Sequence, residues 1–337
     1  MTKTKKASYI INLIGLIVLF FAILGLSSAG VLSKYMMTII MLVCINIVLA
    51  VSLNLTVGFL GQIALGHAGF MSIGAYAAAL FSKNFMTHVA KGPMADVRFI
   101  LALLVGGVAA ACFGVIVGIP ALRLKGDYLA IITLGFGEII RVIIENVSFT
   151  GGAQGLRGIP RIANFSMVFW VTAICVAIMF AFVRSRHGRA IMAIREDDIA
   201  SEASGIPNTY YKVLAFTLTA FFAGIAGAIY AHQYAILAPK TFGFLRSIEL
   251  IVIVVLGGMG SITGSVIAAI GLTVLPEALR AFSEYRMLAY SVALIVVMIF
   301  KPSGLLGTYE FSLTGFLMKF QKSKDKKQKI TKGGAEV

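Results

Sequence analysis

Long runs of apolar residues recur along the whole chain, separated by short polar segments. A helix that crosses a lipid bilayer needs about 20 mostly apolar residues, or fewer when it is broken or supported by neighbours. Ten runs fit this description, at 9–26, 35–57, 61–82, 98–119, 127–146, 166–184, 211–232, 247–258, 262–280 and 287–301. The alternating pattern of a membrane barrel is absent. The chain is therefore predicted to be an all-α integral membrane protein, a polytopic helix bundle of about ten membrane segments, some short or broken.

Composition and charge agree with this class. Of the 337 residues, 59% are hydrophobic and 13% are charged, which is about half the charged share of a soluble protein. We expect residues 1–306 to form one transmembrane domain and residues 307–337 to form a basic, disordered cytoplasmic tail. The net charge of +15 raises the question of a nucleic-acid partner, but its location argues against one.

The positive charge lies mainly at the ends of the chain and in short loops. MTKTKK opens the sequence, and KFQKSKDKKQKITK (319–332) nearly closes it. Lys and Arg gather on the cytoplasmic side of membrane proteins. The pattern therefore predicts a multi-pass protein of the bacterial plasma membrane with both termini in the cytoplasm, embedded in lipid and not bound to nucleic acid.

The residues that usually carry catalysis or bind metals are sparse and badly spaced for either task. Cys44, Cys112 and Cys175 each lie in an apolar run, so we expect small buried hydrophobes and no disulfide. No H-x-x-x-H, H-E-x-x-H or G-x-x-x-x-G-K-[ST] pattern occurs. VLGGMGSITGSVIAAI (255–270) is instead predicted to be a tight turn between two short membrane helices. We expect no catalytic residue, metal or bound cofactor, and hence no enzyme.

A second glycine-rich segment, TVGFLGQIALGHAGFMSIGAY (56–76), allows two interpretations. Its five glycines do not keep one helical face. We favour close helix packing through small residues, which membrane bundles use often. The alternative is an unwound segment beside a solute path, because non-helical backbone is tolerated where it lines a cavity. Gly58, Gln62 and His67 are then the candidates for lining that path.

Charged residues inside an apolar run pose a similar choice. GDYLAIITLGFGEIIRVIIEN (126–146) places Glu138, Arg141 and Glu145 where they can pair along one helix face. A full helical span would leave Glu138 near mid-membrane, where charge is costly. Either the helix is broken and Glu138 lies shallow, which we favour, or its carboxylate faces a wet cavity.

The polar stretch GRAIMAIREDDIASEASGI (188–206) separates two apolar runs and is predicted to be an ordered knob of two short helices. Ile191 and Ile194 share a face of the first helix, Ile199 and Ala203 share a face of the second, and Gly205 ends it. Acidic residues flank the start of the second helix, where the helix dipole favours negative charge. A helix that rests on lipid prefers basic residues, so the pattern favours docking of a soluble partner.

This stretch resembles the coupling loop of permease subunits of ATP-binding-cassette (ABC) importers, which sits in a cleft of the ATPase subunit. NLTVGFLGQIALGHAGFMSIGAY, GDYLAIITLGFGEIIR, TGGAQGLRGI and VVLGGMGSITGSVIAA resemble the LivM-like family of branched-chain amino-acid permeases. The resemblance covers about 40–306. It implies a coupling loop at 185–210, with the matching ATPase-coupling positions Gly188, Arg189, Ala193, Arg195, Glu196, Asp197, Ala200, Glu202 and Gly205.

The resemblance also implies partners and a cargo. The partners are a second, LivH-like permease subunit, two ATP-binding subunits that use the ATP, and an external solute-binding protein that delivers Leu, Ile or Val. Related permeases carry urea, short amides or other amino acids, and this alternative stays open. A stand-alone secondary transporter or channel is a further alternative, but it would place acidic residues at mid-membrane and would need no docking loop.

Overall fold

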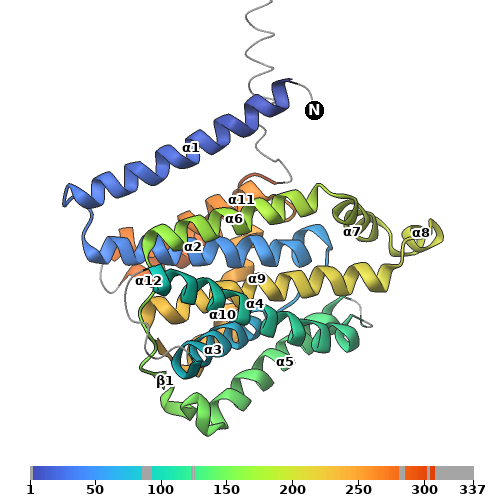
Figure 1. Cartoon of the computed structure of the whole chain (residues 1–337). Helices are drawn as coiled ribbons and strands as arrows, with labels where there is room; N and C mark the ends of the chain where they lie inside the picture. The colour runs from blue at the N-terminus through green and yellow to red at the C-terminus, as the bar shows by residue number, and fades with distance from the viewer. Residues whose placement is uncertain are drawn as a thin grey trace, which may run out of the picture. The chain divides into compact units, whose positions relative to one another are not determined.

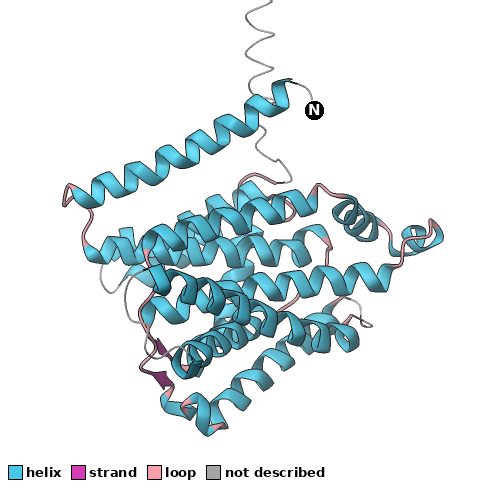
Figure 2. Cartoon of the chain, in the orientation of Figure 1, coloured by secondary structure: helices cyan, strands magenta, loops and turns pink. Residues whose placement is uncertain are grey.

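The computed structural model describes residues 3–85, 93–122, 124, 126–280, 285–301 and 304–307, and these are almost entirely helical (Figure 1, Figure 2). The main helices are α1 (Lys3–Ser28), α2 (Lys34–Asn54), α3 (His67–Phe85), α4 (Pro93–Ala121), α5 (Asp127–Asn146), α6 (Phe165–Val183), α7 (Arg186–Glu196), α8 (Asp198–Ala203), α9 (Asn208–Tyr234), α10 (Phe244–Gly257), α11 (Ile262–Ala278) and α12 (Arg286–Phe300). The shorter elements are a π-helical turn η1 (Leu55–Phe59), the 3-10 turns η2 (Ser148–Thr150), η3 (Gly152–Gln154) and η4 (Pro239–Phe242), and the strands β1 (Leu156–Arg157) and β2 (Ile236–Leu237). The strands pair antiparallel with Leu156 opposite Leu237.

Each of the ten apolar runs coincides with a helix, which confirms the all-α class. Five helices are long and apolar enough to cross a membrane among the residues described: Ile11–Ser28, Lys34–Phe59, Met94–Ala121, Phe165–Val183 and Asn208–Tyr234. The count of about ten membrane segments therefore stays a prediction. The chain divides into two units, with α1 in one and residues 37–309 in the other. Of the tail predicted at 307–337, only Gly307 is among the described residues.

Close packing of α3, α4 and α9 forms the centre of the larger unit. A Cβ atom built on Gly74 of α3 would lie 2.2 Å from the Cα atom of Gly224 on α9. A Cβ on Gly224 would in turn lie 2.5 Å from the carbonyl oxygen of Gly106 on α4. The three backbones therefore touch through glycine, the contact that small residues permit in membrane bundles.

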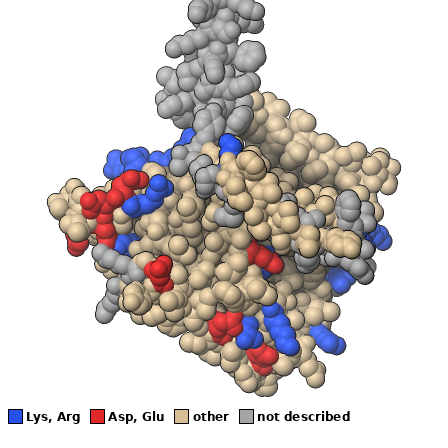
Figure 3. Space-filling view, turned by 180° about the vertical axis from the view of Figure 1, so that it is seen from behind, with Lys and Arg blue, Asp and Glu red and all other residues tan. Residues whose placement is uncertain are grey.

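The larger unit exposes apolar side chains and keeps its charges in groups. On α5, Ile131, Ile139 and Ile143 are 63%, 54% and 55% exposed along one stripe of the helix. Figure 3 shows a surface that is mostly uncharged, with blue and red side chains lying beside one another in a few groups. Apolar surface of this extent is unusual on a soluble monomer and suits contact with lipid or with another membrane subunit.

Helix α9 connects two opposite faces of the larger unit. It begins directly after α7 and α8, and its 27 residues extend about 40 Å to the end that lies near β1 (Figure 1). We call the side that carries α7 and α8 the knob face and the opposite side the far face. Helix α5 ends at the far face, and α10 begins there.

Both glycine-rich segments interrupt the helices at defined points. The chain leaves α2 through η1 and stays non-helical from Leu60 to Gly66 before α3 begins. The favoured interpretation, close packing through glycine, is confirmed, because a Cβ atom on Gly66 would lie 2.2 Å from the Thr133 carbonyl oxygen and one on Gly74 would lie 2.2 Å from the Gly224 Cα atom. The backbone from Leu60 to Gly66 is also unwound, as the alternative required, but its place beside a solute path stays a prediction. The turn predicted between two short helices is confirmed at 258–261, where Gly258 and Gly260 have φ values of 109° and 88°.

Two expectations about single residues are wrong. Helix α5 is continuous, so the favoured break before Glu138 does not occur. Glu138 instead lines a cavity and pairs with Arg141, as in the alternative that places its carboxylate in a cavity. Cys112 is exposed, whereas Cys44 and Cys175 are buried as expected. Cys112 is exposed although Ala110 and Gly114, on either side of it in α4, pack against α9.

Candidate functional site

The polar stretch at 188–206 forms the predicted knob of two short helices, α7 and α8. Ser185 caps α7 by accepting a hydrogen bond from the Gly188 amide. Ile191 and Ile194 face inward, with exposures of 0% and 4%. Between the helices, Asp197 Oδ1 accepts hydrogen bonds of 2.9 Å from the amides of Ile199 and Ala200. Buried isoleucines and capped ends therefore give the knob a fixed shape.

A buried polar network fastens α8 to the start of α9. Lys212 Nζ lies 2.8 Å from Asp198 Oδ1, and Asn208 Nδ2 donates to the same oxygen at 2.9 Å. Ser201 donates from Oγ to Asn208 Oδ1 at 3.0 Å. Asn208 and Lys212 are each 7% exposed. Asp198 therefore has polar contacts with two residues of α9, which fasten the second helix of the knob to the start of α9.

The outer surface of the knob combines one large apolar side chain with acids and small residues. Ile199 is 79% exposed, and the side chain of Glu196 is 77% exposed. Ala200, Glu202 and Gly205 are also exposed. Gly205 has φ +82° and ends α8, with its amide donating to the Glu202 carbonyl at 2.9 Å. Such a surface suits docking, because an exposed isoleucine rimmed by charges can enter an apolar pocket of a partner.

The nine predicted coupling positions separate into an outer and an inner group. The outer group is exposed and consists of Arg189, Arg195, Glu196, Asp197, Ala200, Glu202 and Gly205. In the inner group, Ala193 is half-buried and Gly188 is buried, and a Cβ on Gly188 would lie 2.1 Å from the Val183 carbonyl oxygen. Gly188 therefore allows α7 to pack on the end of α6 and does not face a partner. The coupling role of these positions stays a prediction.

Arg195 extends from the knob to the break between α2 and α3. Its Nη1 atom donates to the Gly58 carbonyl at 2.8 Å. A Cβ on Gly61 would lie 2.8 Å from Arg195 Cγ, and one on Gly260 would lie 3.2 Å from Arg195 Nη1. The guanidinium group therefore reaches η1 and the turn between α10 and α11 at the same time.

Asn54 joins η1 to that same turn from inside the protein. Its side chain is completely buried, accepts from the Gly260 amide at 2.9 Å, and donates to the Ser261 carbonyl at 2.9 Å. A Cβ on Gly58 would lie 2.2 Å from the Gly260 nitrogen. We call Asn54, Gly58, Arg195, Gly260 and Ser261 the junction cluster. It connects the knob with the tips of two helical hairpins, α2–α3 and α10–α11.

The three path-lining candidates lie in or next to the interrupted segment. Gly58 is buried in the junction cluster. Gln62 is half-buried, and its Oε1 atom is buried without a hydrogen-bond partner among the residues that the structure describes. His67, the first residue of α3, is 1% exposed. Its Nε2 atom lies 3.2 Å from Ser52 Oγ of α2. Sequence spacing placed all three in one segment, but their role in lining a path stays a prediction.

Several functional candidates lie outside the residues that the sequence singled out. No sequence pattern separates Asp198 from its acidic neighbours or links it with Lys212, fourteen residues further along. Ile199 was part of an amphipathic pattern, and only its exposure marks it as a docking residue.

Comparison with known proteins identifies the class of membrane protein to which this arrangement belongs. Residues 35–301 match the family described as "Branched-chain amino acid transport system / permease component". The chain therefore belongs to this family of integral membrane permeases, which are transport components and not enzymes.

Individual relatives agree with the family. The chain is 35% identical over 319 residues to the "High-affinity branched-chain amino acid transport system permease protein LivM" of Escherichia coli K12, covering 84% of this chain and 73% of the relative. It is 36% identical to the LivM protein of Salmonella typhimurium, over 78% of this chain and 68% of the relative. The LivH permease protein of Escherichia coli K12 is 26% identical over 78% of this chain and 91% of its own length. No solved structure gives a significant match.

Proposed function

We propose that this chain is the membrane-spanning permease subunit of an importer that moves leucine, isoleucine and valine, driven by ATP hydrolysis on separate subunits. The observation that carries the proposal is the knob, which is rigidly fastened yet presents an exposed isoleucine and acids to solvent. The sequence has no G-x-x-x-x-G-K-[ST] phosphate loop, so uphill transport needs a motor on another chain. The family membership and the LivM relatives supply the cargo class.

The proposal places the knob face in the cytoplasm and the far face outside. Arg184, Arg186 and Arg189 lie at or next to the start of α7 and are exposed, as the excess of basic residues on the cytoplasmic side requires. Both termini are then cytoplasmic in the plasma membrane. Two ATP-binding subunits dock on the inside, and an external solute-binding protein docks on the far face. A LivH-like subunit completes the pair of permeases.

Coupling follows from what the knob contacts. ATP-driven closure of the motor subunits displaces the knob, and Arg195 passes this displacement to η1 and to the turn at Gly260. The Asp198–Lys212 pair passes it to α9. The motor can drive a change between inward and outward access only by binding the two states with different affinity.

The main alternative keeps the architecture but changes the cargo to urea, a short amide or another amino acid. The solute that the cognate external protein binds separates these cargoes. A stand-alone secondary transporter or channel is disfavoured by the knob, for which such a protein has no use.

Replacing Ile199 with Asp is expected to weaken binding of the ATPase subunits about 30-fold, the effect of losing a central apolar contact of about 2 kcal/mol. The measurement is co-purification and titration of the ATPase subunits against the detergent-solubilised permease pair. Ile236→Asp is the matched control, because Ile236 is also an exposed isoleucine (52%) but lies on β2 at the far face. Equal ATPase binding by both variants would exclude the knob as the docking surface.

A further inference from the structure

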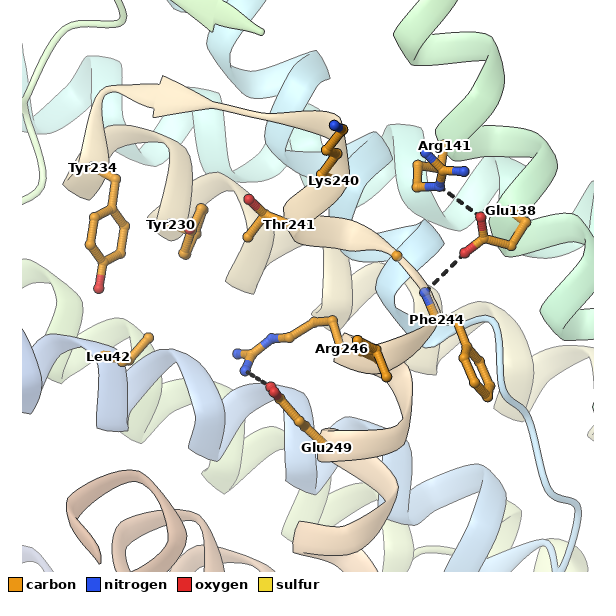
Figure 4. A pocket seen from close by; sticks show the side chains of 12 residues that line it. Leu42, Glu138, Arg141, Tyr230, Tyr234, Lys240, Thr241, Phe244, Arg246 and Glu249 are labelled. Atoms are coloured by element: carbon orange, nitrogen blue, oxygen red, sulfur yellow. Dashed lines mark hydrogen bonds and ion pairs between the residues drawn. The ribbon is translucent and has the colours of Figure 1, made fainter. Parts of the chain in front are cut away.

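A cavity of about 670 Å³, the one that Glu138 lines, opens at the far end of α9, away from the knob. Residues from α2, α5, α9, η4 and the start of α10 line it (Figure 4). Its size is within the range of sites for small ligands, about 300–1,000 Å³. Charged side chains of both signs lie around it, beside tyrosines and apolar residues.

The charged side chains of α5 beside the cavity are paired with one another. Arg141 lies between Glu138 and Glu145, with a nitrogen 2.7 Å from an oxygen of each. Glu138 also accepts a hydrogen bond of 2.9 Å from the Phe244 amide at the first residue of α10. That hydrogen bond links α5 to α10, and Glu138 and Arg141 are both already engaged by the protein.

Two charged side chains at the cavity, of opposite sign, are accessible to a ligand. Among the described residues Lys240 of η4 has no ion pair with an acid, and it is exposed. Glu249 of α10 pairs with Arg246 at 2.9 Å, but its side chain is 58% exposed. Figure 4 shows Lys240 and Glu249 on opposite sides of the cavity. A cation and an anion separated in this way match a molecule that carries both charges itself.

The start of α10 already holds a carboxylate of the protein. Helix N-termini carry a partial positive charge and bind carboxylates, and here Glu138 accepts the hydrogen bond of the first amide, at Phe244. Lys240 is therefore the group at this end of the cavity that can hold the carboxylate of a ligand. Tyr230 and Tyr234, whose rings lie 4.6 Å apart, and Leu42 from α2 provide an apolar wall for the rest of the ligand.

We propose that this cavity binds a free, zwitterionic amino acid, with its carboxylate at Lys240 and its ammonium group at Glu249. The inference rests on the proposed function and specifies the chemistry of the cargo. The side chain of the amino acid then lies against the two tyrosines and Leu42. Urea and short amides carry neither charge, so the cavity would hold them weakly.

The test is binding of radiolabelled leucine to the purified wild-type complex without the external binding protein. Competition by leucinamide, which lacks the carboxylate, and by 4-methylpentanoate, which lacks the ammonium group, reports each end separately. We expect Lys240→Gln and Glu249→Gln each to weaken leucine binding about tenfold, the scale of a hydrogen bond to a charged group. Lys240→Gln should leave the affinity for leucinamide unchanged, because leucinamide has no carboxylate for Lys240 to bind. Glu249→Gln should leave the affinity for 4-methylpentanoate unchanged, because that compound has no ammonium group.

Arg161→Gln is the matched control, because Arg161 is an exposed cation in the segment between β1 and α6 that does not line the cavity. Unchanged leucine binding by both cavity variants, or equal competition by urea, overturns the cavity assignment. The proposed function fails separately, when the complete wild-type complex with its binding protein imports urea and not leucine.

Discussion

Replacing Arg195 with Gln is expected to lower ATP-driven uptake at least tenfold while the ATPase subunits still bind. The Arg195 guanidinium is the direct contact from the knob to the Gly58 carbonyl, at 2.8 Å, and it also lies against Gly260. Hydrogen bonds to charged groups contribute about 1.5–3 kcal/mol, so the shorter, neutral Gln loses most of this contact. The docking surface around Ile199 stays intact, and the motor then hydrolyses ATP without moving the two hairpins.

The measurement compares leucine uptake into proteoliposomes with ATP hydrolysis by the same samples. We expect uptake to fall at least tenfold, the scale of one such lost contact, with ATPase binding unchanged. Arg186→Gln is the matched control, because this exposed arginine at the start of α7 is not one of the nine predicted coupling positions. Normal uptake by the Arg195 variant would remove the junction cluster from the coupling route.

The glycine contact between α3 and α9 is expected to be essential for the fold. Gly74→Leu is expected to prevent formation of a stable permease, because even its Cβ atom would lie 2.2 Å from the Cα atom of Gly224. The clash is with backbone, so no change of side-chain conformation relieves it. Overpacking of a tight core costs about 1–3 kcal/mol when neighbours can shift, and the contact with Gly106 behind Gly224 opposes such a shift.

Thermal stability of the purified protein in detergent tests this expectation. Gly135→Leu is the control, since a Cβ on Gly135 of α5 meets no atom within 4 Å. The Gly74 variant should give aggregated or strongly destabilised protein and the Gly135 variant a normal melting temperature. Equal stability of the two would show that α3 and α9 are not packed as described.

Local patterns in the sequence predicted the elements well. Each of the ten apolar runs predicted one of the twelve α-helices among the described residues, and the glycines at 255–270 predicted the turn between α10 and α11. The knob followed from Ile191 and Ile194, whose helical spacing places both on one buried face. These features depend on residues close together in the chain, which is the distance over which periodicity and turn chemistry operate.

What the sequence did not predict depends on partners far along the chain. A break in α5 was favoured because a carboxylate at Glu138 is costly in lipid, but Phe244 on α10 donates to that carboxylate across 106 positions. The contact between Arg195 and Gly58 spans 137 positions, and that between Asn54 and Gly260 spans 206. Spacing alone cannot show that such residues meet.

The central claim is that the permease is moved from the cytosol by a separate motor that grips the knob. The most direct measurement is leucine accumulation by proteoliposomes that hold the two permease subunits, with and without the ATPase subunits, in the presence of the binding protein and ATP. We expect accumulation against the gradient only when the ATPase subunits are present. Uphill accumulation by the permease subunits alone would contradict it.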